Sequence, residues 1–149
     1  METSDFLTYA ENTLDYGIMG ILFIMSIVTL WLFIERLMFY RSVRIEDYDN
    51  KDALELDLSD NLSTIGAMGA NAPYVGLLGT VIGIMLTFYS LGDIGAVDAK
   101  KIMMGLALAL KATALGLVVA IPAISFYTIL LRKMEKIVTK FDIAREAKK

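Results

Sequence analysis

The chain has 149 residues, 56% of them hydrophobic, a mean hydropathy of +0.59 and a formal net charge of −3 at pH 7. Because this composition is too apolar for a soluble domain of ordinary size, most of the chain is predicted to lie in a lipid bilayer. The sequence contains no His and no Cys, and its basic residues are not interleaved with stacking aromatics, so no enzyme, metal site, cofactor or nucleic-acid partner is expected.

The first membrane helix is expected over about residues 16–38. Residues 1–15 contain acidic residues but no Lys or Arg, so the positively charged region of a signal peptide is missing and the segment is expected to stay. Residues 16–34 are 19 uncharged residues, close to the roughly 20 that cross the hydrocarbon core. An aromatic and basic collar, typical of a membrane interface, lies at the end of this segment: Trp31, Arg36, Tyr40 and Arg41. Glu35 is interpreted as a neighbour of these arginines, with no further role.

A cytoplasmic loop over residues 39–66 is predicted to contain an amphipathic helix outside the bilayer. The loop is hydrophilic and mostly acidic, but four apolar residues recur at i, i+4, i+8 and i+11, which is one helical face. These residues are Leu54, Leu58, Leu62 and Ile65.

The second membrane helix is expected over about residues 67–91 and contains the uncharged run NAPYVGLLGTVIGIMLTFYSL. Pro73 should make the helix begin or kink nearby, because proline removes an amide donor and disturbs the preceding turn. The small residues of this helix share one face: Gly76, Gly79, Thr80, Gly83 and Thr87. Gly79 and Gly83 form a GxxxG pair, and close packing against another helix is the favoured role of the glycines. Packing explains Thr80 least.

A third membrane helix is expected over about residues 101–131, after a short outer turn and before a basic amphipathic tail at residues 132–149. Pro122 lies within 20 uncharged residues, 112–131, and should kink the helix. This helix carries a second stripe of small residues: Ala109, Ala112, Thr113, Gly116, Ala120 and Ala123.

Thr80 and Thr113 are expected at the same depth in the bilayer. Thr80 lies 11 residues before Leu91 and Thr113 lies 12 residues after Lys101, so a rise of 1.5 Å per residue puts both roughly 17 Å from the outer turn. A hydroxyl in a membrane helix commonly bonds to the carbonyl four residues earlier, and that explanation stays open for both threonines. The alternative is a polar layer that faces a pore in an oligomer.

The distribution of Lys and Arg predicts an N-terminus outside the cytoplasm and a C-terminus inside it. The first 15 residues have none, residues 36–51 have four, the outer turn has two and the tail has seven. The expected fold is therefore all-α, with three transmembrane helices and cytoplasmic helical extensions. No extramembrane part is large enough for an enzyme domain, so the function is expected to lie in the membrane.

The segments APYVGLLGTVIGIM (residues 72–85) and ALKATALGLVVAIPA (residues 109–123) resemble the second and third membrane helices of the ExbB and TolQ family, which is related more distantly to the flagellar stator protein MotA. The resemblance implies a single membrane domain over residues 1–149 in the bacterial inner membrane. It also implies a pentameric ring of such chains, with an ExbD-like or TolR-like single-span partner in the central pore. In that family the positions of Thr80 and Thr113 line the pore opposite an essential aspartate of the partner.

A proton-driven motor suits this composition. A carboxylate in hydrocarbon costs about 2.5 to 3.5 kcal/mol on insertion scales, so it needs hydroxyl neighbours or protonation. Passage of one proton yields about 2.3 kcal/mol per 100 mV, and repeated protonation and release would turn or tilt the partner helix. The leading hypothesis is thus a motor subunit that energises a TonB-like protein for outer-membrane transport.

The chain departs from the family pattern at two positions. Leu108 stands five residues before Thr113, where the family usually has glutamate, so the acidic member of the proton path is missing. Lys111 lies about 200° around the helix from Thr113, and a snorkelling side chain or a partner to an acidic residue of a neighbouring subunit is favoured over a role in the proton path. The cytoplasmic loop is also much shorter than is usual in this family.

Two alternatives to the leading hypothesis stay open. One is a motor for envelope integrity or rotation, TolQ-like or MotA-like, although the large cytoplasmic domain of a stator is not present in this sequence. The other is a non-conducting scaffold, in which the small-residue faces serve assembly only and both threonines can be replaced by valine.

Overall fold

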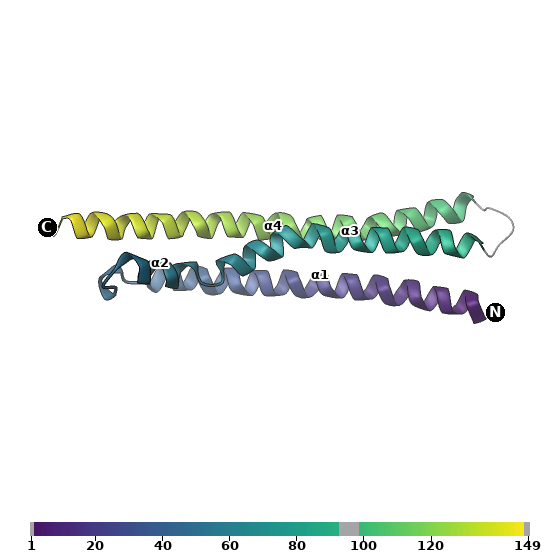
Figure 1. Ribbon diagram of the computed structural model, residues 1–149, viewed down its shortest axis with the longest axis horizontal. Coiled ribbons are helices and arrows are strands. Elements are labelled where there is room, and N and C mark those ends of the chain that lie inside the picture. The colour runs from purple at the N-terminus through teal and green to yellow at the C-terminus, as the bar shows by residue number, and fades with distance from the viewer. Residues whose placement is uncertain (1, 93–98, 148–149) are drawn as a thin grey trace.

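The computed structural model describes residues 2–92 and 99–147. The helices are α1 (Glu2–Ser42), α2 (Lys51–Ser59), α3 (Leu62–Gly92) and α4 (Ala99–Glu146), with a 3-10 turn, η1 (Ile45–Asp47), between α1 and α2. Figure 1 shows an elongated bundle in which the N-terminus of α1, the end of α3 and the start of α4 share one end. The short α2 and the C-terminal part of α4 lie at the other end.

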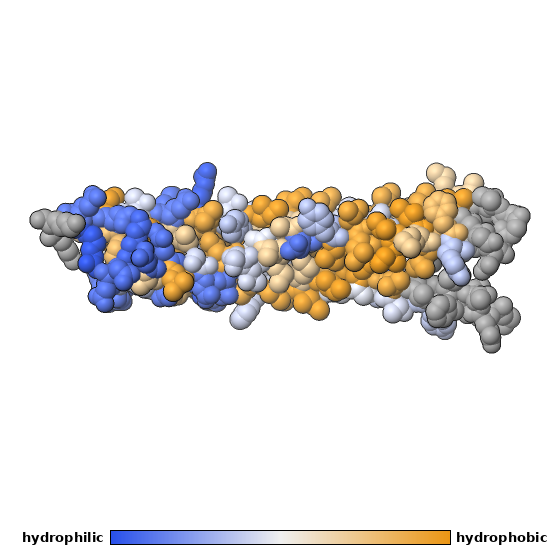
Figure 2. Space-filling view, in the orientation of Figure 1, coloured by the Kyte–Doolittle hydropathy of each residue, from blue (hydrophilic) through white to orange (hydrophobic). Residues whose placement is uncertain are grey.

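The three long helices are apolar and long enough to cross a membrane, within Thr13–Ser42, Lys51–Tyr89 and Ile102–Glu146. Figure 2 shows a broad hydrophobic belt along the bundle and a hydrophilic end around α2 and the C-terminal part of α4. These observations confirm the predicted all-α fold with three membrane helices and helical extensions beyond them. We refer to the hydrophilic end as the polar end.

The helices extend beyond the ranges expected from the sequence. The first is longer at both ends than residues 16–38, the second begins at Leu62 and not near residue 67, and the third continues without a break into the tail. Both α3 and α4 continue as helices through their prolines, Pro73 and Pro122. In Figure 1 the ribbon of α3 changes direction in its first half. The expected outer turn falls mostly on residues 93–98, outside the described residues.

The amphipathic helix expected in the cytoplasmic loop is divided into two. The first piece, α2, starts at the N-cap Asn50, whose side chain accepts a hydrogen bond from the amide of Ala53 at 2.7 Å. The second piece is the start of α3. Asn61 separates them with φ of 60°, in the left-handed region that Asn tolerates better than most residues. All four apolar residues of the predicted face are buried nevertheless: Leu54, Leu58, Leu62 and Ile65.

These four residues belong to a core of large side chains at the polar end, which we call the polar-end core. Leu130 of α4 is fully buried in it, and Val138 and Phe141 of the tail are buried as well. At its membrane side, the rings of Phe33 and Phe126 stack with centroids 4.2 Å apart. Burial of apolar surface from α1, α2, α3 and α4 therefore joins the helices where they leave the bilayer.

Two side chains of α1 cap the C-terminus of α2. The guanidinium of Arg36 donates to the carbonyl of Asp57 at 3.0 Å, and the hydroxyl of Tyr40 donates to the carbonyl of Leu58 at 2.6 Å. The last four carbonyls of a helix have no partner within it, and a cation there is also favoured by the helix dipole. Nearby, Tyr48 donates to the side chain of Asp57 at 2.9 Å, and desolvation together with this bond raises the pKa of the Tyr48 phenol.

Arg36 is therefore more than part of a headgroup collar. Its side chain is buried and forms a bidentate ion pair with Glu35, with N–O distances of 2.6 and 2.7 Å. Glu35 thus neutralises a buried cation, a role that the sequence interpretation did not assign to it. The other collar residues, Trp31 and Arg41, are exposed.

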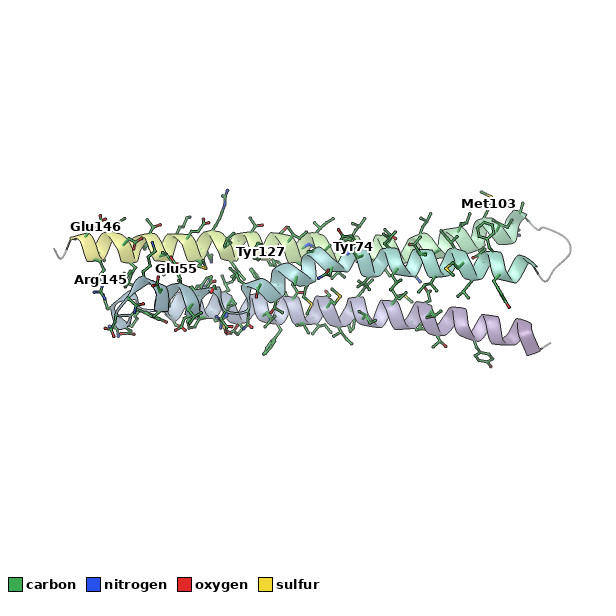
Figure 3. The ribbon with its side chains drawn as sticks, viewed as in Figure 1. Glu55, Tyr74, Met103, Tyr127, Arg145 and Glu146 are labelled. Atoms are coloured by element: carbon green, nitrogen blue, oxygen red, sulfur yellow. The ribbon has the colours of Figure 1, made fainter. Side chains whose placement is uncertain are left out.

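Hydrogen bonds and an ion pair join the end of α4 to residues 48–51, where α2 begins. Arg145 donates to the carbonyls of Tyr48 and Asp49 at 2.9 and 2.5 Å, and Lys51 pairs with Asp142 at 2.7 Å. Figure 3 shows Arg145 at the end of the molecule where α2 lies. The tail therefore packs as part of the bundle.

Candidate functional site: a hydroxyl pair between α3 and α4

The backbones of two membrane helices approach each other closely at Gly76 of α3 and Gly116 of α4. A Cβ added at Gly76 would lie 2.6 Å from the carbonyl oxygen of Ala112, and one added at Gly116 would lie 2.7 Å from the carbonyl oxygen of Ala72. The obstructing atoms belong to backbone, so a larger residue at either position would force the two backbones apart. We call this contact the α3–α4 seam. In Figure 3 the label of Tyr74, two residues before Gly76, marks where this contact lies along α3.

The two predicted small-residue stripes face each other along this seam within one chain. A Cβ at Gly79 would lie 2.7 Å from the Cβ of Ala112, and one at Gly83 would lie 2.9 Å from the Cβ of Ala109. Ile18 of α1 also contacts the Gly79 position. The alanines of the α4 stripe are almost completely buried: Ala109, Ala112, Ala120 and Ala123. Small residues thus bring the two backbones close together, as the hydrocarbon environment favours.

Thr80 and Thr113 meet in this seam. Their Oγ1 atoms lie 2.5 Å apart, and the Oγ1 of Thr80 lies 3.0 Å from the carbonyl oxygen of Ala109. The carbonyl of Gly76, four residues before Thr80, is farther away at 3.4 Å. The depth count predicted a shared level, and the structure shows direct contact of the hydroxyls. For Thr80, bonding to its own helix is therefore the weaker of the two carbonyl contacts.

The geometry allows the hydroxyl pair to relay a proton. Each hydroxyl has one donor and two acceptor positions. When Thr113 donates to Thr80, Thr80 donates to the carbonyl of Ala109. When Thr80 donates to Thr113, the proton of Thr113 is free to point to a third group. Thr80 is buried, with 7% of its surface exposed, whereas Thr113 is half-buried, so Thr113 offers the accessible end of the pair.

Two further threonines lie buried in the membrane helices. Thr87 donates to the carbonyl of Gly83 at 2.9 Å, and its side chain occupies the space beside Gly105. Thr29 of α1 is buried, and its hydroxyl has no hydrogen-bond partner among the described residues. Thr29, like Thr80, is a threonine within an apolar run, but no glycine or alanine stripe surrounds it, so periodicity did not single it out.

The remaining candidate positions lie outside the seam. Lys111 is exposed on α4, and Leu108 is about half exposed. Pro73 is half-buried and Pro122 is exposed. Within the described residues no group of three or more acidic side chains is arranged to hold a metal ion.

Comparison with known proteins assigns the chain to a family. Residues 32–143 match the model of the MotA/TolQ/ExbB proton channel family, which is most of the chain and includes the whole seam. The chain belongs to this family. Membership and the three apolar helices indicate a multi-pass inner-membrane protein that is a transport component. The resemblance seen in the two glycine- and alanine-rich segments is thereby confirmed.

Several relatives of similar length are named for biopolymer transport. The chain is 53% identical over 133 residues to the "Putative biopolymer transport protein ExbB-like 2" of Helicobacter pylori, covering 89% of each protein. It is 52% identical over 135 residues to "Biopolymer transport protein ExbB" of the same species, covering 91% of this chain and 93% of the relative. It is 54% identical over 126 residues to the protein of that name in Aquifex aeolicus, covering 85% of each. An ExbB-like role follows.

Proposed function

We propose that this chain is a subunit of an inner-membrane proton-channel motor, in which the Thr80–Thr113 pair forms part of the proton path. The motor would use the proton motive force together with an ExbD-like single-span partner. Through a TonB-like protein it would energise transport across the outer membrane. The observation that carries this proposal is the hydroxyl contact in the seam, with Thr113 at its accessible end.

Helix packing alone gives a poor account of this contact. The seam already closes through glycine and alanine, and hydrogen bonds between membrane helices contribute only about 0.6 kcal/mol on average. A carboxylate of a partner helix in hydrocarbon costs about 2.5 to 3.5 kcal/mol, so hydroxyls that can donate to it have a larger effect there than in packing. The hydroxyl of Thr113, which can turn its proton away from Thr80, is suited to donate a hydrogen bond to such a carboxylate.

The surface of the bundle supports assembly into an oligomer, for which we propose a pentameric ring. Many large apolar side chains of the membrane helices are exposed in the single chain, among them Leu77 and Val81 of α3 and Leu117 and Ile121 of α4. Lipid, neighbouring subunits and the partner helix would cover them. The surplus of Lys and Arg at the polar end supports a cytoplasmic C-terminus and a periplasmic N-terminus.

The names of the relatives favour an ExbB-like role over a TolQ-like role in envelope integrity, because the three described above are all named for biopolymer transport. A non-conducting scaffold would require the seam glycines but would not require the hydroxyls of Thr80 and Thr113.

Uptake by cells tests the proposal. Thr80→Val and Thr113→Val keep the shape of threonine but remove the hydroxyl, whereas Thr80→Ser and Thr113→Ser keep the hydroxyl. In cells that depend on this gene for TonB-dependent uptake, we expect the valine variants to lose uptake at least tenfold and the serine variants to retain it. Normal membrane levels and normal co-purification of the partner serve as controls. Full uptake by both valine variants would refute the role of the hydroxyls.

A further inference from the structure

A cavity of about 190 Å³ lies between α1, α3 and α4, toward the end of the bundle that holds the N-terminus. Its lining includes Asp15 and Ile18 of α1, Gly83 of α3, and Gly105, Leu108 and Ala109 of α4. Apart from Asp15, the lining residues that the structure describes are all apolar. A carboxylate that lines such a cavity favours water inside it, and the volume has room for several water molecules.

Asp15 stands at the outer boundary of the membrane part of α1. It lies 21 residues before Arg36, which caps α2 at the polar end, and a rise of 1.5 Å per residue separates the two by roughly 30 Å. That length equals the thickness of the hydrocarbon core. Within the described part of the chain, Asp15 forms no hydrogen bond or ion pair that would explain its place as structural.

The cavity adjoins the hydroxyls of the seam. The carbonyl of Ala109, a lining residue, accepts the hydrogen bond of Thr80 at 3.0 Å. The carbonyl of Gly83, also a lining residue, accepts that of Thr87 at 2.9 Å. Two residues that line the cavity with Asp15 thus also accept hydrogen bonds from buried threonines, one of them Thr80 of the Thr80–Thr113 pair.

Leu108 lines the same cavity from α4. This is the position at which the resemblance leads one to expect glutamate, and among the described lining residues the ionisable side chain comes from α1 instead.

We propose that Asp15 is the carboxylate through which protons enter the path, in place of an acidic residue at position 108. The inference rests on the proposed function. In each passage the carboxylate takes a proton from hydronium in the outer water and leaves a water molecule. It then gives the proton to water in the cavity next to the hydroxyl pair, and the carboxylate is restored.

Proton flux into liposomes tests this role, with the protein co-purified with its ExbD-like partner under an imposed membrane potential. Asp15→Asn should lower the flux at least tenfold, whereas Asp15→Glu should keep most of it. Because Leu108 faces the same cavity, Asp15→Asn combined with Leu108→Glu should recover at least a third of the original flux. Glu46→Gln removes an exposed carboxylate that pairs with Arg44 at the polar end and should change nothing.

The outcomes separate this inference from the proposed function. Wild-type flux in Asp15→Asn, alongside flux lost in Thr80→Val, would overturn the role of Asp15 and leave the motor intact. Flux lost in both Asp15→Asn and Asp15→Glu, with normal assembly and no recovery by Leu108→Glu, would show that aspartate is needed for shape and would also overturn it. A wild-type complex that conducts no protons would overturn the proposed function, and this inference with it.

Discussion

The α3–α4 seam and the polar-end core hold helices together by opposite means. In the seam, Gly76 and Gly116 bring two backbones so close that a single added methyl group would meet a carbonyl oxygen at 2.6 or 2.7 Å. In the polar-end core, large side chains such as Leu54 and Leu130 are fully buried, and polar groups of α1 cap α2. This difference in packing reflects what surrounds each region, which is lipid at the seam and water at the polar end. Lipid gives apolar side chains no reason to cluster, whereas water does.

The comparison also separates packing from chemistry. The polar-end core uses its polar atoms to satisfy helix-terminal carbonyls, a structural task. The seam has no helix terminus to satisfy, yet it contains two hydroxyls in contact. Variants that change size or remove one polar atom in each region should therefore have different effects.

The largest effect is expected from Leu54→Ala in the polar-end core. Leu54 is completely buried, and its truncation leaves a cavity in a region where water drives packing, so a loss of about 2 to 5 kcal/mol of stability is expected. Thermal unfolding in detergent measures it. Leu56→Ala on the same helix is the control, because Leu56 is 73% exposed and should lose no more than about 0.5 kcal/mol. Equal losses for the two variants would contradict the placement of α2.

Gly76→Ala makes the opposite change of size in the seam. The added methyl group would push α3 and α4 apart at the carbonyl of Ala112, at a cost of about 1 to 3 kcal/mol. Gly20→Ala of α1 adds the same group where no atom lies within 4 Å, and we expect no loss of stability. Thermal unfolding of both variants in detergent measures the two changes in stability. A stable Gly76→Ala beside a destabilised Gly20→Ala would refute the helix arrangement described here.

Tyr40→Phe should have a smaller effect. It leaves the carbonyl of Leu58 without its donor in a buried position, which costs about 1 to 2 kcal/mol. Tyr48→Phe removes a hydrogen bond to Asp57 that water can replace, so only a few tenths of a kcal/mol should be lost. Urea titrations of the detergent-solubilised protein compare the two. The cap is refuted if Tyr48→Phe is the more damaging variant.

Lys111→Leu should have the smallest effect. The side chain is exposed on α4 and lies outside the seam, where a snorkelling amine needs no specific partner. Uptake should stay within about twofold of wild type, as measured in the cellular assay, and unfolding should be unchanged. A loss comparable to that of Thr113→Val would instead place Lys111 in the proton path.

The sequence was sufficient to predict features that depend on one helix at a time. Periodicity identified both small-residue stripes and the buried face of Leu54, Leu58, Leu62 and Ile65. A fixed rise per residue placed Thr80 and Thr113 at one level, because the second membrane helix ends at the outer turn and the third begins there. The division of the loop helix was missed, since the run Ser-Asp-Asn at residues 59–61 is a turn signal that the apolar periodicity outweighed.

Features that depend on which helices meet were beyond the sequence. Arg36 was interpreted as a headgroup contact, because the carbonyl that it caps, that of Asp57, lies 21 residues later in the chain. Asp15 was counted only among the acidic residues of the N-terminal segment, because the cavity that it lines exists only when three helices are together. Periodicity also showed two small faces without showing that they contact each other within one chain.

The most direct test of the central claim is proton flux into liposomes containing this protein and its ExbD-like partner. The double variant Thr80→Val, Thr113→Val is compared with Thr80→Ser, Thr113→Ser, since the first removes the hydroxyls and the second keeps them. We predict that the valine pair lowers the flux at least tenfold while the serine pair stays within about threefold of wild type. Wild-type flux through the valine pair would show that the hydroxyls lie outside the conducting path.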